Sequence, residues 1–190
     1  MPTLHLDRPL ERAILQGHPW IYEDALKPSR AKAGAVVTVR DRRDRFLARG
    51  IREGGPIGVR VWSLDGQETI DQALVERRVR QSIERREGLV GDSDAYRLVH
   101  GEGDQLPGIV VDRYGPYAVV RLEGAVAECG FVLDGLRMAL RDHRGVLLRR
   151  GRKHDVQSEV FCGQAPPKDL VVREHGMRLC VNVWKGQKTG

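Results

Sequence analysis

The sequence predicts an α+β fold, in which a small N-terminal β-barrel is followed by a mixed α/β domain. Three observations support this prediction. Short β-prone runs separated by polar, glycine-rich turns fill roughly the first 65 residues. Apolar residues then recur at helical spacing between residues 70 and 89. Beyond residue 95, β-prone runs alternate with a second amphipathic stretch and end in a hairpin.

The N-terminal barrel is expected to open with one short helix. Pro9 suits the first helical turn and Gly17 suits the helix end. An extended aromatic segment, 18–22, should follow, because proline disfavours helical geometry in the residue before it. Three strands are then expected over residues 35–40, 45–51 and 57–62, with turns at 41–44 and 54–56.

A single amphipathic helix over residues 70–89 is predicted to link the two domains. It carries five arginines, namely Arg77, Arg78, Arg80, Arg85 and Arg86. These arginines could form a phosphate-binding face. We favour a solvated face with ion pairs to Glu76, Glu84 and Glu87, because such pairs are normal on helix surfaces. The chain therefore divides into the barrel (1–68), the linking helix (69–90) and the second domain (91–190).

The second domain should mix strands and one helix. Strands are expected at 96–100, 109–114, 117–122 and 146–148, a helix at about 126–143, and a hairpin pairing 170–173 with 177–183. Residues 149–169 show no clear period and are predicted to be a loop. The chain stops soon after a well-formed hairpin, which predicts a domain boundary with further sequence beyond it.

The charge composition favours a soluble partner of nucleic acid. The formal net charge is +6, and 26 of the 32 basic residues are arginine. Arginine donates planar, paired hydrogen bonds that suit phosphates and base edges; arginine-rich codon usage is the alternative explanation. No apolar run approaches the roughly 20 residues of a membrane-spanning helix, and the N-terminus lacks a secretory pattern. We therefore expect a cytoplasmic protein that does not bind membranes.

Residue chemistry alone indicates no catalytic centre. Motifs for a serine nucleophile, a Walker loop and a zinc protease are absent from the sequence. The cysteines are widely spaced (Cys129, Cys162 and Cys180). A disulfide framework is therefore not expected, and we predict that Cys162 and Cys180 are buried and structural. Scattered histidines predict no metal site. Turn-forming, solvated roles are favoured over a catalytic cluster for three acidic residues, Glu102, Asp104 and Asp112.

Several segments occur in an order that resembles one family. The first group is LQGHPWI (15–21), FLARG (46–50) and IGVRVW (57–62); the second is YRLVHGEGDQLPGIVVDRY (96–114); the third is EHGMRLCV (174–181) and GQKTG (186–190). They resemble, in turn, the PUA domain, the central domain and the hairpin before the catalytic domain of the class I ribosomal RNA methyltransferases. That family modifies cytosine C5 in large-subunit RNA.

The resemblance implies a role in ribosomal RNA processing. In the family, a Rossmann-like domain follows the GQKTG stretch, binds S-adenosylmethionine and supplies the nucleophilic cysteine. We expect no Rossmann domain and no cofactor for these 190 residues alone, and none of the three cysteines inherits the catalytic role. Lys188 and Thr189 would lie at the edge of an incomplete cofactor site. The chain is then the RNA-binding portion of a methyltransferase, not catalytic by itself, either cut before the catalytic domain or naturally truncated.

The same resemblance makes structured ribosomal RNA the expected partner. Candidate contacts in the barrel surround the turn at 41–44 and comprise Arg40, Arg42, Arg43, Arg45 and Arg49. A second basic run contains Arg149, Arg150, Arg152 and Lys153, for which a solvated loop is the alternative. For Trp20, packing is favoured over base stacking. The alternative function is a protein-interaction or dimerisation module, a homodimer or a partner of a separate catalytic subunit, using the helix at 70–89 or the end near Trp184.

Overall fold

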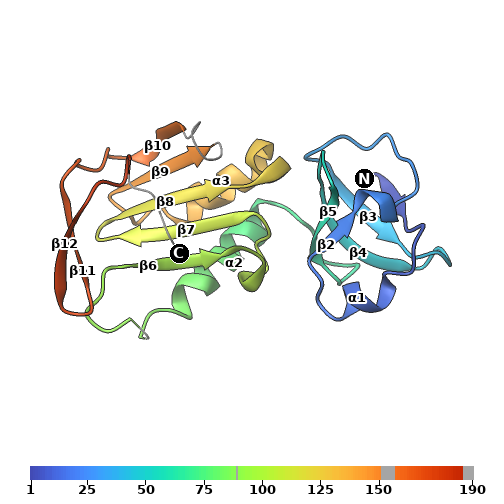
Figure 1. Ribbon diagram of the computed structural model, residues 1–190, viewed down its shortest axis with the longest axis horizontal. Helices are drawn as coiled ribbons and strands as arrows, with labels where there is room; N and C mark the ends of the chain where they lie inside the picture. The colour runs from blue at the N-terminus through green and yellow to red at the C-terminus, as the bar shows by residue number, and fades with distance from the viewer. Residues whose placement is uncertain (89, 151–156, 186–190) are drawn as a thin grey trace.

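The computed structural model describes residues 1–88, 90–150 and 157–185. Two β-rich units lie next to each other along the long axis of the molecule (Figure 1). Each contains a five-stranded sheet, and a two-stranded hairpin completes the second unit. The mixed α and β content agrees with the predicted fold class.

The N-terminal unit is a sheet of strand order β1-β3-β4-β5-β2. Its elements are β1 (Thr3–His5), α1 (Glu11–Leu15), β2 (Trp20–Tyr22), η1 (Glu23–Ala25), β3 (Val36–Arg40), β4 (Phe46–Arg52) and β5 (Ile57–Ser63). The predicted helix, aromatic strand and three following strands are confirmed. Strand β1, which pairs in parallel with β3, was not predicted, because three residues are too few for a periodic signal.

Alternation of side chains separates the two faces of this sheet. Leu4 and Leu6 flank His5, and both are buried, as are Val37 and Val39 in β3. His5 lies opposite Arg40 in the β1–β3 register. Because successive side chains of a strand point to opposite faces, His5 and Arg40 share the outer face of the sheet.

The second unit contains a sheet of order β10-β9-β8-β7-β6, in which only the β8–β9 pair is parallel among the described strands. Its elements are α2 (Gln72–Glu84), β6 (Ala95–His100), η2 (Gly101–Asp104), β7 (Ile109–Tyr114), β8 (Tyr117–Leu122), η3 (Gly124–Glu128), α3 (Gly130–Ala139), β9 (Gly145–Arg150) and β10 (Gln157–Gly163). Helices α2 and α3 cover one face (Figure 1). The hairpin β11 (Leu170–Glu174) and β12 (Met177–Val181) packs on the other through Leu170 and Val172.

Both predicted long helices are shorter in the structure. Helix α2 begins after Asp71, whose carboxylate accepts a hydrogen bond from Leu74 N, and it ends at Glu84. Gly88 follows with φ of +97°, a conformation that favours glycine and ends helices. The single helix predicted at 126–143 is wrong: Cys129 has extended backbone and separates η3 from α3. Local sequence period cannot report such a break.

The loop predicted for 149–169 is wrong over β10. This strand pairs antiparallel with β9, and the register shifts between Val160 and Cys162. A bulge of this kind interrupts the two-residue alternation by which a strand is recognised in a sequence. The strand forms because the edge of β9 supplies hydrogen-bonding partners, so tertiary pairing decides its conformation.

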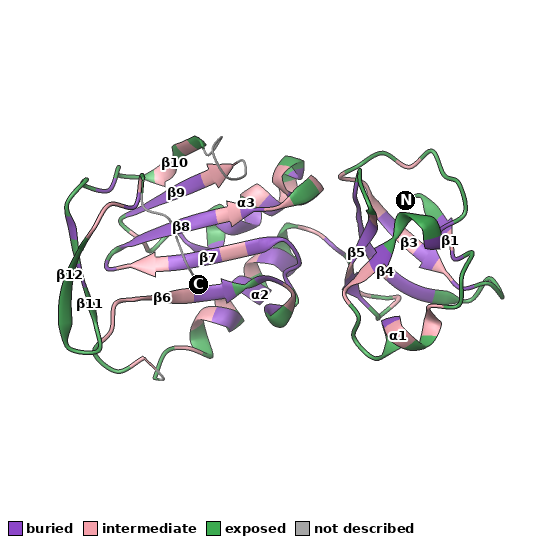
Figure 2. Cartoon of the chain, viewed as in Figure 1, coloured by how far each residue is buried: buried purple, intermediate pink, exposed green. Residues whose placement is uncertain are grey.

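The two units share an apolar core. Ile51 of β4 and Trp62 of β5 belong to the same buried cluster as Leu74 of α2, Leu106 and Val126. Figure 2 shows burial concentrated in the two sheets and on the inward sides of the helices. The N-terminal sheet is therefore packed directly on the second unit.

Candidate nucleic-acid interface

The structure places four predicted arginines on one hairpin. Arg40 ends β3, Arg42 and Arg43 lie in the turn, and Arg45 precedes β4. Asp44 adopts φ of +64° and closes the turn, as does a hydrogen bond of 2.9 Å from Arg45 N to the Asp41 carboxylate. Arg49 lies further along β4 and donates to the Glu68 carbonyl at 2.7 Å.

Most of these arginines already have acidic partners. Arg45 pairs with Asp41 at 2.8 Å and Arg42 with Glu11 at 3.3 Å. Arg40 pairs with Asp44 at 3.6 Å. The side chain of Arg43 is exposed and forms no ion pair with any described residue. The turn therefore presents less free positive charge than its sequence indicates.

The second basic run begins at the end of β9. Arg150 donates to the Ala127 carbonyl at 3.2 Å, and Glu128 and Glu159 lie within 3.6 Å and 3.5 Å of its guanidinium. Arg149 lies 3.5 Å from the Trp184 carbonyl. Arg152, Lys153, Lys188 and Thr189 lie outside the described residues.

The arginines of α2 all form ion pairs. Arg77 and Arg78 bind Glu68, Arg80 binds Glu76, and Arg85 and Arg86 bind Asp104, at 2.7–3.1 Å. The favoured interpretation of ion pairing is confirmed, although only Glu76 is a predicted partner. The solvated face is wrong for Arg78, which is buried and donates to the Trp62 and Gln105 carbonyls.

The acidic residues expected to be solvated instead anchor arginines. Asp104 is buried, and its carboxylate accepts hydrogen bonds from His100 N and from Arg85 and Arg86. Burial by itself would raise the pKa of Asp104, but these hydrogen bonds outweigh it and lower that pKa. Asp112 pairs with Arg97 at 3.0 Å. The partners are distant in sequence, so solvated roles were the wrong prediction.

A buried ion-pair network, which we call the junction network, joins the two units. Arg60 of β5 has 6% of its side chain exposed and donates to Glu53 at 2.8 Å and Glu102 at 2.7 Å. Glu102 belongs to η2 of the second unit and also accepts a hydrogen bond from the indole of Trp20. Glu53 accepts one from Ala125 N at 2.8 Å. The expected packing role of Trp20 therefore includes a polar contact across the junction.

Glu53 occupies the position where a parallel strand pair often holds a ligand. Ligands of parallel α/β units bind beyond the carboxyl ends of the strands. Beyond β8, a Cβ on Gly124 would collide with the Glu53 carboxylate, and one on Gly108 would lie 3.6 Å from Arg60 Cζ. The N-terminal unit fills this space, so the described residues here do not fit S-adenosylmethionine.

The cysteines show no features of a nucleophile. Cys129 is buried, and burial raises the pKa of its thiol to about 11. Burial also raises the pKa of Cys162. Cys180 is exposed, which corrects the expectation that it is buried. Within the parts of the chain that the structure describes, no group of histidine, cysteine and acidic residues could hold a metal ion.

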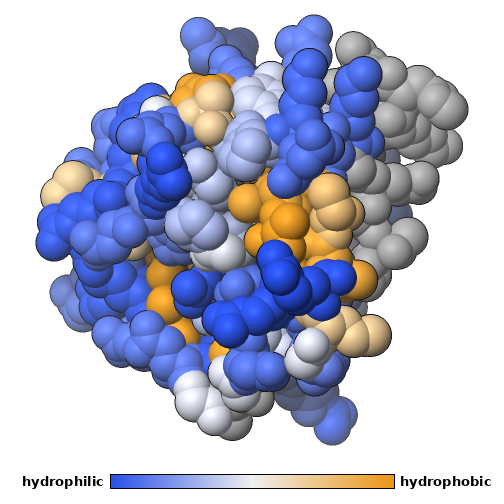
Figure 3. All heavy atoms as spheres, turned by 90° about the vertical axis from the view of Figure 1, so that its left-hand side faces the viewer, coloured by the Kyte–Doolittle hydropathy of each residue, from blue (hydrophilic) through white to orange (hydrophobic). Residues whose placement is uncertain are grey.

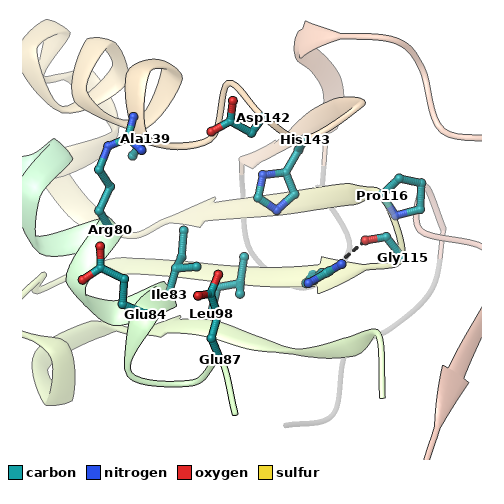
Figure 4. Close-up of a pocket in the computed structure, with 11 residues that line it drawn as sticks. Arg80, Ile83, Glu84, Glu87, Leu98, Gly115, Pro116, Ala139, Asp142 and His143 are labelled. Atoms are coloured by element: carbon teal, nitrogen blue, oxygen red, sulfur yellow. Dashed lines mark hydrogen bonds between the residues drawn. The ribbon is translucent and has the colours of Figure 1, made fainter. Parts of the chain in front are cut away.

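One pocket of about 380 Å³ lies between the ends of α2 and α3 and the β7–β8 turn. Figure 4 shows Arg80, Glu84, Glu87 and His143 around it. Burial lowers the pKa of His143. The lining mixes charges of both signs and includes no serine, threonine or cysteine, so it lacks the nucleophile–base pair of a covalent catalyst.

Two further surface features are apparent. The hairpin β11–β12 exposes Val171, Met177 and Leu179, and Figure 3 shows apolar atoms at this end of the molecule within a mostly hydrophilic surface. Trp184 is half-buried and donates to the Pro166 carbonyl.

Sequence reasoning missed a second basic surface on the N-terminal unit. Lys27, Arg30 and Lys32 are exposed, and their side chains form no ion pair with any residue the structure describes. The sequence contained a signal for them. Residues 27–40 carry four cations and no acidic residue, whereas the turn that follows alternates arginine with aspartate.

Comparison with protein families identifies the N-terminal unit. Residues 4–64 match the family model described as a PUA-like domain. The chain contains a PUA-like domain. The resemblance of the barrel to a PUA domain is thereby confirmed.

Curated relatives extend the similarity beyond the PUA-like domain. The chain is 34% identical over 205 residues to "Ribosomal RNA large subunit methyltransferase I" of Klebsiella pneumoniae, with 100% of this chain and 50% of the relative covered. The enzyme of the same name from Salmonella newport is 34% identical over 201 residues, with the same coverage. The chain thus spans about half the length of the curated relatives it matches, and it is homologous to their N-terminal half.

Solved structures share the fold. A SAM-dependent methyltransferase from Streptococcus mutans superimposes with a TM-score of 0.80 and 18% identity over 96% of this chain and 49% of the other. A methyltransferase complexed with SAH gives a TM-score of 0.84 and 18% identity over 98% of this chain and 49% of the other. Among the described residues, no helix has the length and apolar character needed to cross a membrane.

Proposed function

We propose that this chain is the RNA-docking part of an S-adenosylmethionine-dependent ribosomal RNA methyltransferase. The observation that carries the proposal is 34% identity over the whole chain to the ribosomal RNA large subunit methyltransferases I. The PUA-like domain and the positive net charge support RNA as the partner. Following the family resemblance, the substrate atom is C5 of a cytosine in large-subunit ribosomal RNA.

In this proposal, the chain positions RNA and leaves the chemistry to the rest of the full-length protein. S-Adenosylmethionine would supply the methyl group there. The described residues support this division, because the buried thiol of Cys129 has a raised pKa and Glu53 fills the space beyond β8. A base must be presented at a defined place for methyl transfer, so a docking domain needs a fixed orientation.

The junction network provides that orientation. Arg60 bridges Glu53 of its own unit and Glu102 of the second unit with little exposure to solvent. The shared core around Ile51 and Trp62 supports the same contact. RNA bound to the PUA-like domain would thereby be held at a constant distance from the second unit.

RNA binding by the 190-residue chain tests the proposal. We expect a transcript of large-subunit ribosomal RNA to bind more tightly than heparin, with an affinity that falls steeply with salt, by about one logarithmic unit per phosphate neutralised. We expect no methyl transfer from labelled S-adenosylmethionine. Equal affinity for heparin, or methylation by this chain alone, would contradict the proposal.

The arginines of the β3–β4 turn are the first proposed contacts. Replacing Arg42 and Arg43 with alanine should weaken binding and reduce the salt dependence by about one to two units, because Arg43 is unpaired and Arg42 is paired only at the surface. The control variant R141A/R144A removes equal charge from the second unit. Unchanged binding by R42A/R43A would exclude this turn as a contact.

A further inference from the structure

The PUA-like domain carries a surface whose positive charge is not neutralised within the protein. It consists of Lys27, Arg30 and Lys32, which we call the basic loop, located between η1 and β3. All three side chains are exposed, and none pairs with a described residue. An exposed cation without an acidic neighbour keeps its full attraction for an anion, whereas one that is already paired must exchange partners.

The backbone of the basic loop is held at several points. Lys27 N donates to the His5 carbonyl at 2.9 Å, and Ala35 N donates to the Lys32 carbonyl at 3.1 Å. Between them, Ala31 packs against the core of the N-terminal sheet. Its neighbours Arg30 and Lys32 therefore project from a fixed base. A loop ordered before binding loses less conformational entropy when a ligand binds.

The basic loop adjoins the outer face of the sheet. Leu26 bridges Leu6 in antiparallel register, which places Lys27 opposite His5. His5 lies opposite Arg40 on the other side of β1. Lys27, His5 and Arg40 thus form one row across the sheet, with the carboxylate of Asp44 bound to the last two.

We propose that the basic loop, continued by Lys27, His5 and Arg40 across the sheet, is the surface of the PUA-like domain that binds the phosphate backbone of RNA. This inference rests on the proposed function and names the residues that carry its affinity. A row of cations on a rigid sheet reads the spacing of phosphates and leaves base identity unread. The arginines of the β3–β4 turn then contribute less than the loop, because their charge is largely paired.

The test compares two variants of equal charge. K27A/R30A/K32A removes three cations from the basic loop, and R141A/R144A/R173A removes three exposed cations from the second unit. Dissociation constants for a large-subunit ribosomal RNA transcript are measured over a series of KCl concentrations. We expect the loop variant to bind at least about tenfold more weakly at 0.1 M KCl, with a salt slope reduced by about two to three, and the control slope to change by less than about one.

A charge-conserving variant separates charge from folding. K27R/R30K/K32R should bind the transcript as the wild-type chain does, because phosphate contacts depend on charge more than on the identity of the cation. If the wild-type chain binds the transcript and K27A/R30A/K32A keeps the wild-type slope, the basic loop is not the contact and the proposed function stands. If the wild-type chain binds heparin as well as the transcript, the proposed function and this inference both fail.

Discussion

The arginines at the junction and the cations of the basic loop belong to the same domain but differ in every physical respect. Arg60 and Arg52 are buried and bound to glutamates, while Lys27 and Arg30 are exposed and unpaired. Removing a partner from a buried pair leaves a charge without solvation, whereas removing an exposed cation leaves only water. A basic composition therefore serves two purposes here, which only the partners of each residue distinguish.

The largest effect should follow from breaking the junction network. Arg60→Ala leaves Glu53 buried without its cation, so we expect the free energy of unfolding to fall by about 3–5 kcal/mol. Urea denaturation followed by circular dichroism measures this change. The control is Arg8→Ala, which breaks the exposed Arg8–Asp24 pair and should cost about 0–1 kcal/mol. Equal losses in the two variants would mean that the junction network adds no more stability than a surface pair.

A second test uses two glycines with similar backbone conformations. Gly124 and Gly115 have φ of +71° and +56°, but only a Cβ on Gly124 would meet Glu53. Gly115→Ala should cost about 1–2 kcal/mol from backbone strain alone. Gly124→Ala should cost about 2–4 kcal/mol, because the carboxylate of Glu53 must also move. Thermal melting of both variants gives the comparison, and a larger loss for Gly115→Ala would contradict the close approach.

The smallest of these effects concerns Asp104, which binds Arg85 and Arg86. Its pKa is lowered in the folded protein, so its contribution is present above the unfolded-state pKa of about 3.9 and is lost as pH falls through the folded value. We expect Asp104→Asn to lower the free energy of unfolding by about 1–3 kcal/mol at pH 7. The difference from the wild type should shrink below about pH 4. A difference that is constant with pH would show that the carboxylate charge is not responsible.

Prediction from the sequence succeeded where the structure is local. The alternation in residues 57–62 identified β5, and the proline and glycine around α1 marked its ends. It failed where a distant segment decides the outcome, as for the bulged strand β10 and for Glu102, whose partners are 42 and 82 residues away. The β3–β4 arginines were found because they cluster, but their pairing with Asp41 and Glu11 depends on the fold.

The shared core has a consequence for how the molecule comes apart. The PUA-like match ends at residue 64, yet Ile51 and Trp62 are buried among residues of the second unit. An excised N-terminal fragment would expose both side chains to water and leave Arg60 without Glu102. The boundary of the family match is thus an evolutionary seam that does not coincide with a cooperative folding unit. Residues on both sides of it should melt in a single transition.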